Sequence, residues 1–147
     1  EDKIRIEFGE TVLSSKLIDG TFPDYQRVIP EGNDKKLSVT TKDLIQAIDR
    51  VATVSTEKSR AVKIAVEKAK AVLSASSAEN ASATEELSVD YDSESLEVGF
   101  NSKYLIDILN ECEGENAQFL LADAVSPTIV RDGGDDAALY VLMPMRV

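Results

Sequence analysis

The chain has 147 residues, of which 43% are hydrophobic and 29% charged, and its formal net charge is −11. This composition is typical of a globular protein rather than a disordered one. The sequence contains no histidine, which excludes Ser-His-Asp and Cys-His catalytic arrangements and the usual zinc sites. The acidic balance argues against a protein that grips nucleic acid tightly, because phosphate contacts need clustered lysine and arginine.

We therefore expect no catalytic residue, no metal and no cofactor. No apolar run approaches the roughly 18 residues that a membrane helix needs, and no signal peptide is visible. The chain starts inside a strand-like pattern without an initiator methionine, so we expect a fragment or a processed product. Cys112 is the only cysteine, which rules out an internal disulfide and favours a buried, inert thiol in a cytoplasmic protein.

The first residues predict a hairpin. Residues 4–8 alternate between apolar and polar side chains, Gly9-Glu10 forms a turn, and residues 11–19 read as a second strand. An isolated hairpin is marginal in water, so this one either belongs to a preceding domain or packs on the main body. Turn residues follow, and we place a boundary near residue 24, which separates a hairpin and linker (1–24) from one domain (25–147).

The next segment predicts a strand, a helix and three strands. Residues 36–40 are strand-like, and Thr40 or Thr41 can cap a helix that carries Asp43 in its first turn. Apolar residues then recur at helical spacing and place the end of this helix around residues 54–55. Alternating residues predict strands at 62–66, 71–76 and 87–91, with a loop of serine, alanine and glutamate at 77–84.

The same order follows a second time. A strand at 96–100 leads to Asn101, a good helix N-cap, and apolar residues from Tyr104 to Cys112 mark a helical stripe. Gly114 is placed to end this helix. Three more strands are predicted at 117–122, 128–131 and 138–143.

These two segments form an internal repeat. Residues 42–48 match residues 103–109 at an offset of 61 (103 − 42), and each half reads strand, helix, three strands. An internal repeat constrains the fold more than any single element does. The sequence therefore predicts an α+β domain with two outer sheets and both helices on one side, not a parallel α/β fold.

Three motifs carry a resemblance to a known family. The segment from Gly20 to Pro30, with Phe22-Pro23-Asp24-Tyr25 in it, looks like the junction between the middle and last domains of the bacterial sliding clamp, the DNA polymerase III beta subunit. Phe100-Asn101-Ser102-Lys103-Tyr104 resembles the start of the last helix in that family. Met143-Pro144-Met145-Arg146-Val147 is close to the family's Met-Pro-Met-Arg-Leu terminus, with valine in place of leucine. The resemblance spans essentially the whole chain.

The resemblance implies a fold and a function. The fold would be a sliding-clamp domain, a duplicated strand-helix-three-strand unit with two helices packed inside curved antiparallel sheets. In that family two three-domain subunits close into a ring around duplex DNA and tether the polymerase, as a non-catalytic processivity factor. Residues 1–24 would end the middle domain, and residues 25–147 would form the C-terminal domain. The alternative is a stand-alone peptide-binding module that does not encircle DNA.

The resemblance also assigns residues to three surfaces. A groove would bind short apolar peptides of the DNA polymerase III alpha subunit, the clamp loader and other partners with the clamp-binding motif. Its expected residues are Pro23, Arg27, Val28, Asn101, Tyr104, Val125, Pro127, Val141, Met143, Pro144, Met145, Arg146 and Val147. Lys42, Arg50 and Lys103 would face the DNA, and Thr53, Val54, Glu79 and Glu85 would contact the second subunit of a homodimer.

Each assignment has a simpler alternative. Val141 and Met143 could be core residues, and Tyr104 could pack within its own domain. The three DNA-facing cations could be solvated charges on helix faces. Thr53 also departs from the bulkier apolar residue that the family leads us to expect, which weakens the assignment of the dimer interface.

Overall fold

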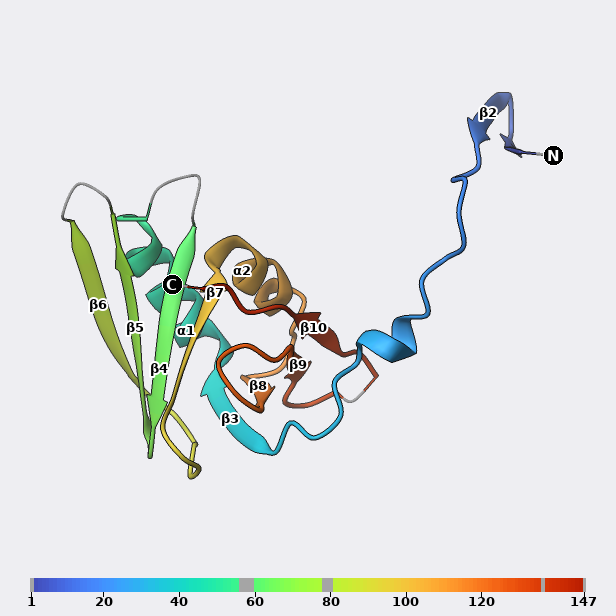
Figure 1. Cartoon of the computed structure of the whole chain (residues 1–147). Coiled ribbons are helices and arrows are strands. Elements are labelled where there is room, and N and C mark those ends of the chain that lie inside the picture. Colours follow the sequence, from blue (N-terminus) through green and yellow to red (C-terminus); the bar gives the residue numbers. More distant parts are fainter. Residues whose placement is uncertain (1, 56–59, 78–80, 136, 147) are drawn as a thin grey trace.

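The computed structural model describes residues 2–55, 60–77, 81–135 and 137–146. At its start, strand β1 (Lys3–Phe8) pairs with β2 (Thr11–Lys16) through a turn in which Gly9 has a φ of +59°, a conformation that favours glycine. Every described residue from 2 to 28 is exposed, and Figure 1 shows the hairpin far from the two large sheets. The expectation that it packs on the main body is therefore wrong, and its membership in a preceding domain stays a prediction.

A short 3₁₀ helix, η1 (Tyr25–Val28), ends this exposed segment. The Asp24 carboxylate accepts a hydrogen bond from the Gln26 N–H at 3.2 Å and pairs with the Arg27 side chain at 3.2 Å. The chain becomes half-buried only at Ile29 and Pro30. The boundary expected near residue 24 thus falls directly before η1.

The body follows the order strand, helix, three strands twice. The elements of the first unit are β3 (Lys35–Thr40), α1 (Thr41–Ala52), β4 (Ala61–Glu67), β5 (Lys70–Ser76) and β6 (Ser82–Ser88). Those of the second are β7 (Leu96–Asn101), α2 (Ser102–Asn110), β8 (Asn116–Leu121), β9 (Thr128–Asp132) and β10 (Tyr140–Leu142). β3 and β7 are offset by 61 residues (96 − 35), so the predicted repeat and the α+β fold are confirmed.

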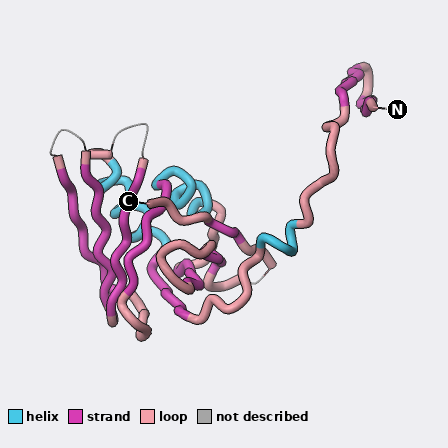
Figure 2. The backbone as a smooth tube through the Cα atoms, viewed as in Figure 1, coloured by secondary structure: helices cyan, strands magenta, loops and turns pink. Residues whose placement is uncertain are grey.

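The two units exchange their first strands. One sheet has the order β10-β9-β8-β3 and the other β6-β5-β4-β7, with every pairing antiparallel. β3 therefore joins the strands of the second unit, and β7 joins those of the first. Figure 2 shows the two helices beside one another with a sheet on either side.

Two backbone bridges link the sheets at equivalent places. Ser38 on β3 exchanges two hydrogen bonds with Asp90, at 2.9 and 2.8 Å, and the Met145 N–H donates to the Gly99 carbonyl on β7 at 2.7 Å. Ser38 and Gly99 are 61 residues apart (99 − 38), so each bridge joins the middle of an exchanged strand to the segment that follows the last strand of a unit. The repeat thus extends to the contacts that hold the sheets together.

One hydrophobic core serves both units. α1 buries Leu44, Ala47, Ile48 and Val51, and α2 buries Leu105 and Leu109. These side chains recur at three- and four-residue intervals, so each helix presents one apolar stripe. The helices contact each other and strands of both sheets, and the buried residues form a single cluster. In the described part of the chain, no helix is long and apolar enough to cross a bilayer.

The predicted boundaries of β6 are wrong. Residues 77–84 were expected to form a loop before a strand at 87–91, whereas β6 spans Ser82–Ser88. In β6 the half-buried Ala83, Glu85 and Leu87 alternate with exposed polar residues. Because β6 is an edge strand with one solvated face, its composition resembles that of a loop.

The predicted helix caps need correction as well. Neither threonine caps α1 through its side chain: Thr40 makes no cap hydrogen bond, and the Thr41 hydroxyl donates to the Gly114 carbonyl at 3.2 Å. Gly114 does not end α2, whose C-cap is Glu111. Its N–H donates to the Asp132 carboxylate at 2.8 Å, and a Cβ there would collide with Asp132. Glycine is needed at this position for a close approach of two turns, not for a helix end.

Three further expectations are only partly met. β2 ends at Lys16 rather than at residue 19, and β10 covers only Tyr140–Leu142 of the predicted 138–143. Cys112 lies beyond the end of α2 and is half-buried rather than buried. Burial and the nearby Asp132 and Glu111 raise the pKa of its thiol, which agrees with an inert side chain.

Two buried threonines allow a matched test of the core. Thr128 has no exposed surface and its hydroxyl has no hydrogen-bond partner, whereas the hydroxyl of the buried Thr41 is bonded. Because an unpaired buried hydroxyl is costly, we expect Thr128→Val to raise the free energy of unfolding by about 1 kcal/mol and Thr41→Val to lower it by about 1 kcal/mol. Chemical denaturation measures both, and a loss of stability in Thr128→Val would contradict this reading.

The two bridges between the sheets can be compared in the same way. Proline removes the N–H donor, whereas alanine shortens the side chain and keeps the donor. We expect Met145→Pro to be about 1 kcal/mol less stable than Met145→Ala, and Asp90→Pro to be less stable than Asp90→Ala by a similar amount. Urea unfolding measures each difference. Equal stability within a pair would mean that its bridge contributes nothing.

Candidate functional site

A groove of about 570 Å³ lies between α2 and the C-terminal tail. Tyr104, Asp107 and Ile108 form one wall, because residues three and four apart lie on the same face of a helix. The tail forms the other wall. The described residues that line the groove are Asn101, Tyr104, Asp107, Ile108, Val141, Leu142, Met143, Pro144 and Met145.

Asn101 fixes the start of the helical wall. Its side-chain oxygen accepts hydrogen bonds from the Lys103 N–H at 3.0 Å and the Tyr104 N–H at 3.4 Å, which confirms the predicted N-cap. The cap holds the first turn in place, and Tyr104 projects from this turn with 57% of its surface exposed. The alternative that Tyr104 packs within its own domain is therefore wrong.

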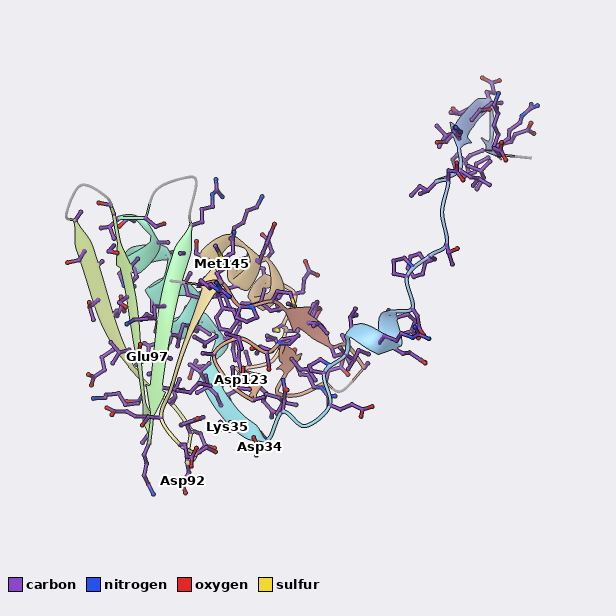
Figure 3. The ribbon with its side chains drawn as sticks, in the orientation of Figure 1. Asp34, Lys35, Asp92, Glu97, Asp123 and Met145 are labelled. Carbon is purple, nitrogen blue, oxygen red and sulfur yellow. The ribbon has the colours of Figure 1, made fainter. Side chains whose placement is uncertain are left out.

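The tail is held at both ends of the groove. β10 pairs with β9 up to Leu142, and Pro144 cannot donate to a strand, so regular pairing stops there. The Met145 N–H then bonds Gly99 on the other sheet at 2.7 Å. Figure 3 places Met145 beside α2. Met143 is 60% exposed between these two anchors, so it is not a core residue.

The surface of the groove is mostly apolar and adaptable. Methionine side chains are flexible and polarisable, so they can fit apolar groups of different shapes. Asp107 is the one charged residue among the described lining residues, and it is exposed. The described residues also include no cluster of histidine, cysteine, aspartate and glutamate that could hold a metal ion. This arrangement suits the binding of apolar side chains.

The structure brings together only part of the predicted set of groove residues. Those in the groove are Asn101, Tyr104, Val141, Met143, Pro144 and Met145. Pro23, Arg27, Val28 and Val125 are exposed and Pro127 is half-buried, but none of them lines this groove. Arg146 lines a neighbouring hollow, and Val147 lies outside the described residues.

Asp107, Ile108 and Leu142 line the groove but were not predicted. The signal for two of them was available, because Asp107 and Ile108 lie three and four residues after Tyr104 on the predicted helix. Leu142 is 5% exposed and belongs to the core cluster, so only its edge can reach the groove.

Val125 lies on a rigid loop away from the groove. The Asp123 carboxylate accepts hydrogen bonds from the N–H groups of Val125 and Ser126, at 2.8 and 2.7 Å, and from the Ser126 hydroxyl at 2.9 Å. These bonds, first that from Val125, lower the pKa of Asp123. The loop therefore presents Val125 with 68% of its surface exposed.

The residues predicted for the other two surfaces are also placed. Lys42 and Lys103 are exposed on α1 and α2, respectively. Arg50 binds Glu85 through both side-chain ends, with Arg50 Nε to Glu85 Oε2 at 2.8 Å, and the pair raises the pKa of Arg50 and lowers that of Glu85. Thr53 is exposed and Val54 is half-buried, whereas Glu79 lies outside the described residues.

Comparison with known proteins places the fold and the groove in a family. Residues 26–146 match the family model of the DNA polymerase III beta subunit, C-terminal domain. The chain is 50% identical to the beta sliding clamp of Caulobacter vibrioides over 145 residues, and 40% identical to that of Escherichia coli K12 over 146 residues. Each match covers 99% of this chain but only 39% and 40% of the relatives, respectively.

A solved structure agrees with the sequence comparison. The sliding clamp (DNA polymerase III subunit beta) of Bartonella birtlesii bound to griselimycin is similar over the whole chain, with a TM-score of 0.92 and 49% identity. The chain covers 40% of that protein. The resemblance seen in the motifs is thereby confirmed, and the chain belongs to the DNA polymerase III beta subunit family, in the region of its C-terminal domain.

Proposed function

We propose that this chain is the C-terminal part of a sliding-clamp subunit, a non-catalytic processivity factor that encircles duplex DNA and tethers the replicative polymerase. The observation that carries the proposal is the 50% identity to a beta sliding clamp along 99% of the chain. The chain spans about two fifths of that relative, so closing a ring requires the rest of a subunit and a second copy. A protein that encircles bacterial DNA works in the cytoplasm, which is the location that we propose.

The charges on the helices support a loose hold on DNA. Lys42 on α1 and Lys103 on α2 are the exposed cations that we assign to the DNA side. Arg50 contributes less than expected, because its charge is offset by Glu85. With a net charge of −11 the chain has few such contacts to offer, and a topological link needs only a few.

The proposed dimer contact is the β6 edge with the end of α1. β6 is the outermost strand of its sheet, and such an edge can pair with another chain. Thr53 and Val54 lie directly after α1, and Glu85 lies on β6 beside Arg50. A partner that needs the Glu85 carboxylate has to share it with Arg50.

The groove is the proposed binding site for partner proteins. Its apolar walls fit two or three apolar side chains of a short peptide, such as the motif expected in the polymerase alpha subunit, the clamp loader and other clamp-binding proteins. Burying that many side chains gives an affinity on the order of micromolar. Such an affinity allows partners to exchange.

Replacing Tyr104 tests the groove. The probe is a fluorescein-labelled peptide with leucine and phenylalanine side chains, and binding is followed by fluorescence anisotropy. We expect Tyr104→Ala to weaken binding at least tenfold, because it removes the exposed aromatic wall of the groove. The matched control is Lys103→Ala, the exposed neighbour that does not line the groove. Equal affinities of the two variants would contradict the assignment.

A second experiment separates the ring from the alternative of a stand-alone peptide-binding module. A full-length subunit that carries this chain is loaded on closed circular DNA by a clamp loader, and the circle is then cut. We expect retention on the closed circle and release from the cut DNA, because a ring is held by topology rather than by tight contacts. Equal retention before and after cutting would contradict the ring.

A further inference from the structure

A second hollow lies next to the groove, on the outer face of the sheet that contains β4, β5 and β6. Its volume is about 470 Å³. It is lined by two cations, Lys63 and Arg146, by the hydroxyl residues Ser74, Ser76, Ser82 and Thr84, and by small alanines. The hollow therefore combines positive charge with several hydrogen-bond donors.

This hollow contrasts with the rest of the chain. The sequence has 27 acidic and 16 basic residues, yet none of the described residues that line the hollow is acidic. Arg146 is exposed, and no salt bridge is found for it in the described part of the chain. Lys63 pairs with Glu97 at 3.1 Å, but their side chains are 40% and 65% exposed, so an incoming anion can compete for Lys63.

The strand register brings the polar groups together. Lys63 on β4 lies opposite Ser74 on β5, and Ser74 lies opposite Thr84 on β6. Directly opposed residues point to the same face of a sheet. Their hydroxyl groups can donate to an anion bound beside Lys63.

The hollow is continuous with the groove. Met145 lines the groove and the next residue, Arg146, lines the hollow. Gly99, which binds Met145, lies opposite Lys63 in the strand register and has no side chain to separate the two sites. In Figure 1 the tail runs from β10 past α2 toward β4. A polypeptide that leaves the groove along the tail therefore reaches the hollow directly.

We propose that the hollow is a second subsite, which takes an acidic side chain of the same polypeptide whose apolar residues occupy the groove. This inference rests on the proposed function of the groove. A carboxylate can pair with the Arg146 guanidinium through two parallel hydrogen bonds and with the Lys63 ammonium through its charge. The apolar groove then supplies the burial, and the hollow selects partners with an acidic residue beside the apolar motif.

The test compares peptides that share one apolar core of leucine and phenylalanine. Three glutamates, or three glutamines as the neutral match, are added at one end or at the other. Because the chain carries a net charge of −11, glutamates should weaken binding unless a local cationic site receives them. We expect the opposite at one of the two ends, where the glutamate peptide binds threefold to tenfold more tightly than its glutamine match, at low salt.

Charge-matched variants locate the effect. The ratio of the two affinities is measured within each variant, so a change in binding of the shared core cancels. We expect Lys63→Gln and Arg146→Gln each to bring the ratio to one or below, and the control Lys36→Gln, an exposed lysine on β3, to leave it high. An unchanged ratio in Lys63→Gln and Arg146→Gln overturns the inference, as does a ratio of one or below in the unaltered chain. Failure of the core peptide to bind overturns the proposed function instead.

Discussion

The exchange of β3 and β7 between the two sheets is the constraint on which the rest of the structure depends. Each exchanged strand carries a backbone bridge at its middle, Ser38 with Asp90 and Gly99 with Met145, at positions 61 residues apart (99 − 38). Neither unit can form its sheet from its own strands alone, so both helices are enclosed in one core. The groove is a consequence, because the second bridge carries the tail past α2.

The equivalence of the two bridges explains where binding can occur. In the first unit, the segment that forms the bridge continues into the next strand. In the second, the bridging residue Met145 belongs to an exposed tail that lines a groove with α2. The same architecture therefore gives one bridge a structural role and leaves the other beside a surface with apolar and cationic portions. In a chain with a net charge of −11, such a surface is suited to select among partners.

The repeat, the α+β fold and the helical wall of the groove could be predicted, since they follow from periodicity in the sequence. The start of β6 could not, because its solvated face has the composition of a loop. The role of Gly114 was hidden for a different reason: it depends on Asp132, 18 residues away, and helix-ending signals are local. Likewise, Arg50 and Glu85 were assigned to different surfaces although they bind each other, because a contact across 35 residues leaves no local pattern.

The central claim is that the bridge from Met145 to Gly99 and the occupied groove form one unit. Amide hydrogen exchange at Met145, measured with and without the apolar peptide, tests it most directly. A bound peptide should hold the tail against β7 and slow exchange at Met145 severalfold or more, while exchange at Asp90, in the equivalent bridge without a groove, stays the same. Unchanged exchange at Met145 under saturating peptide would contradict the account.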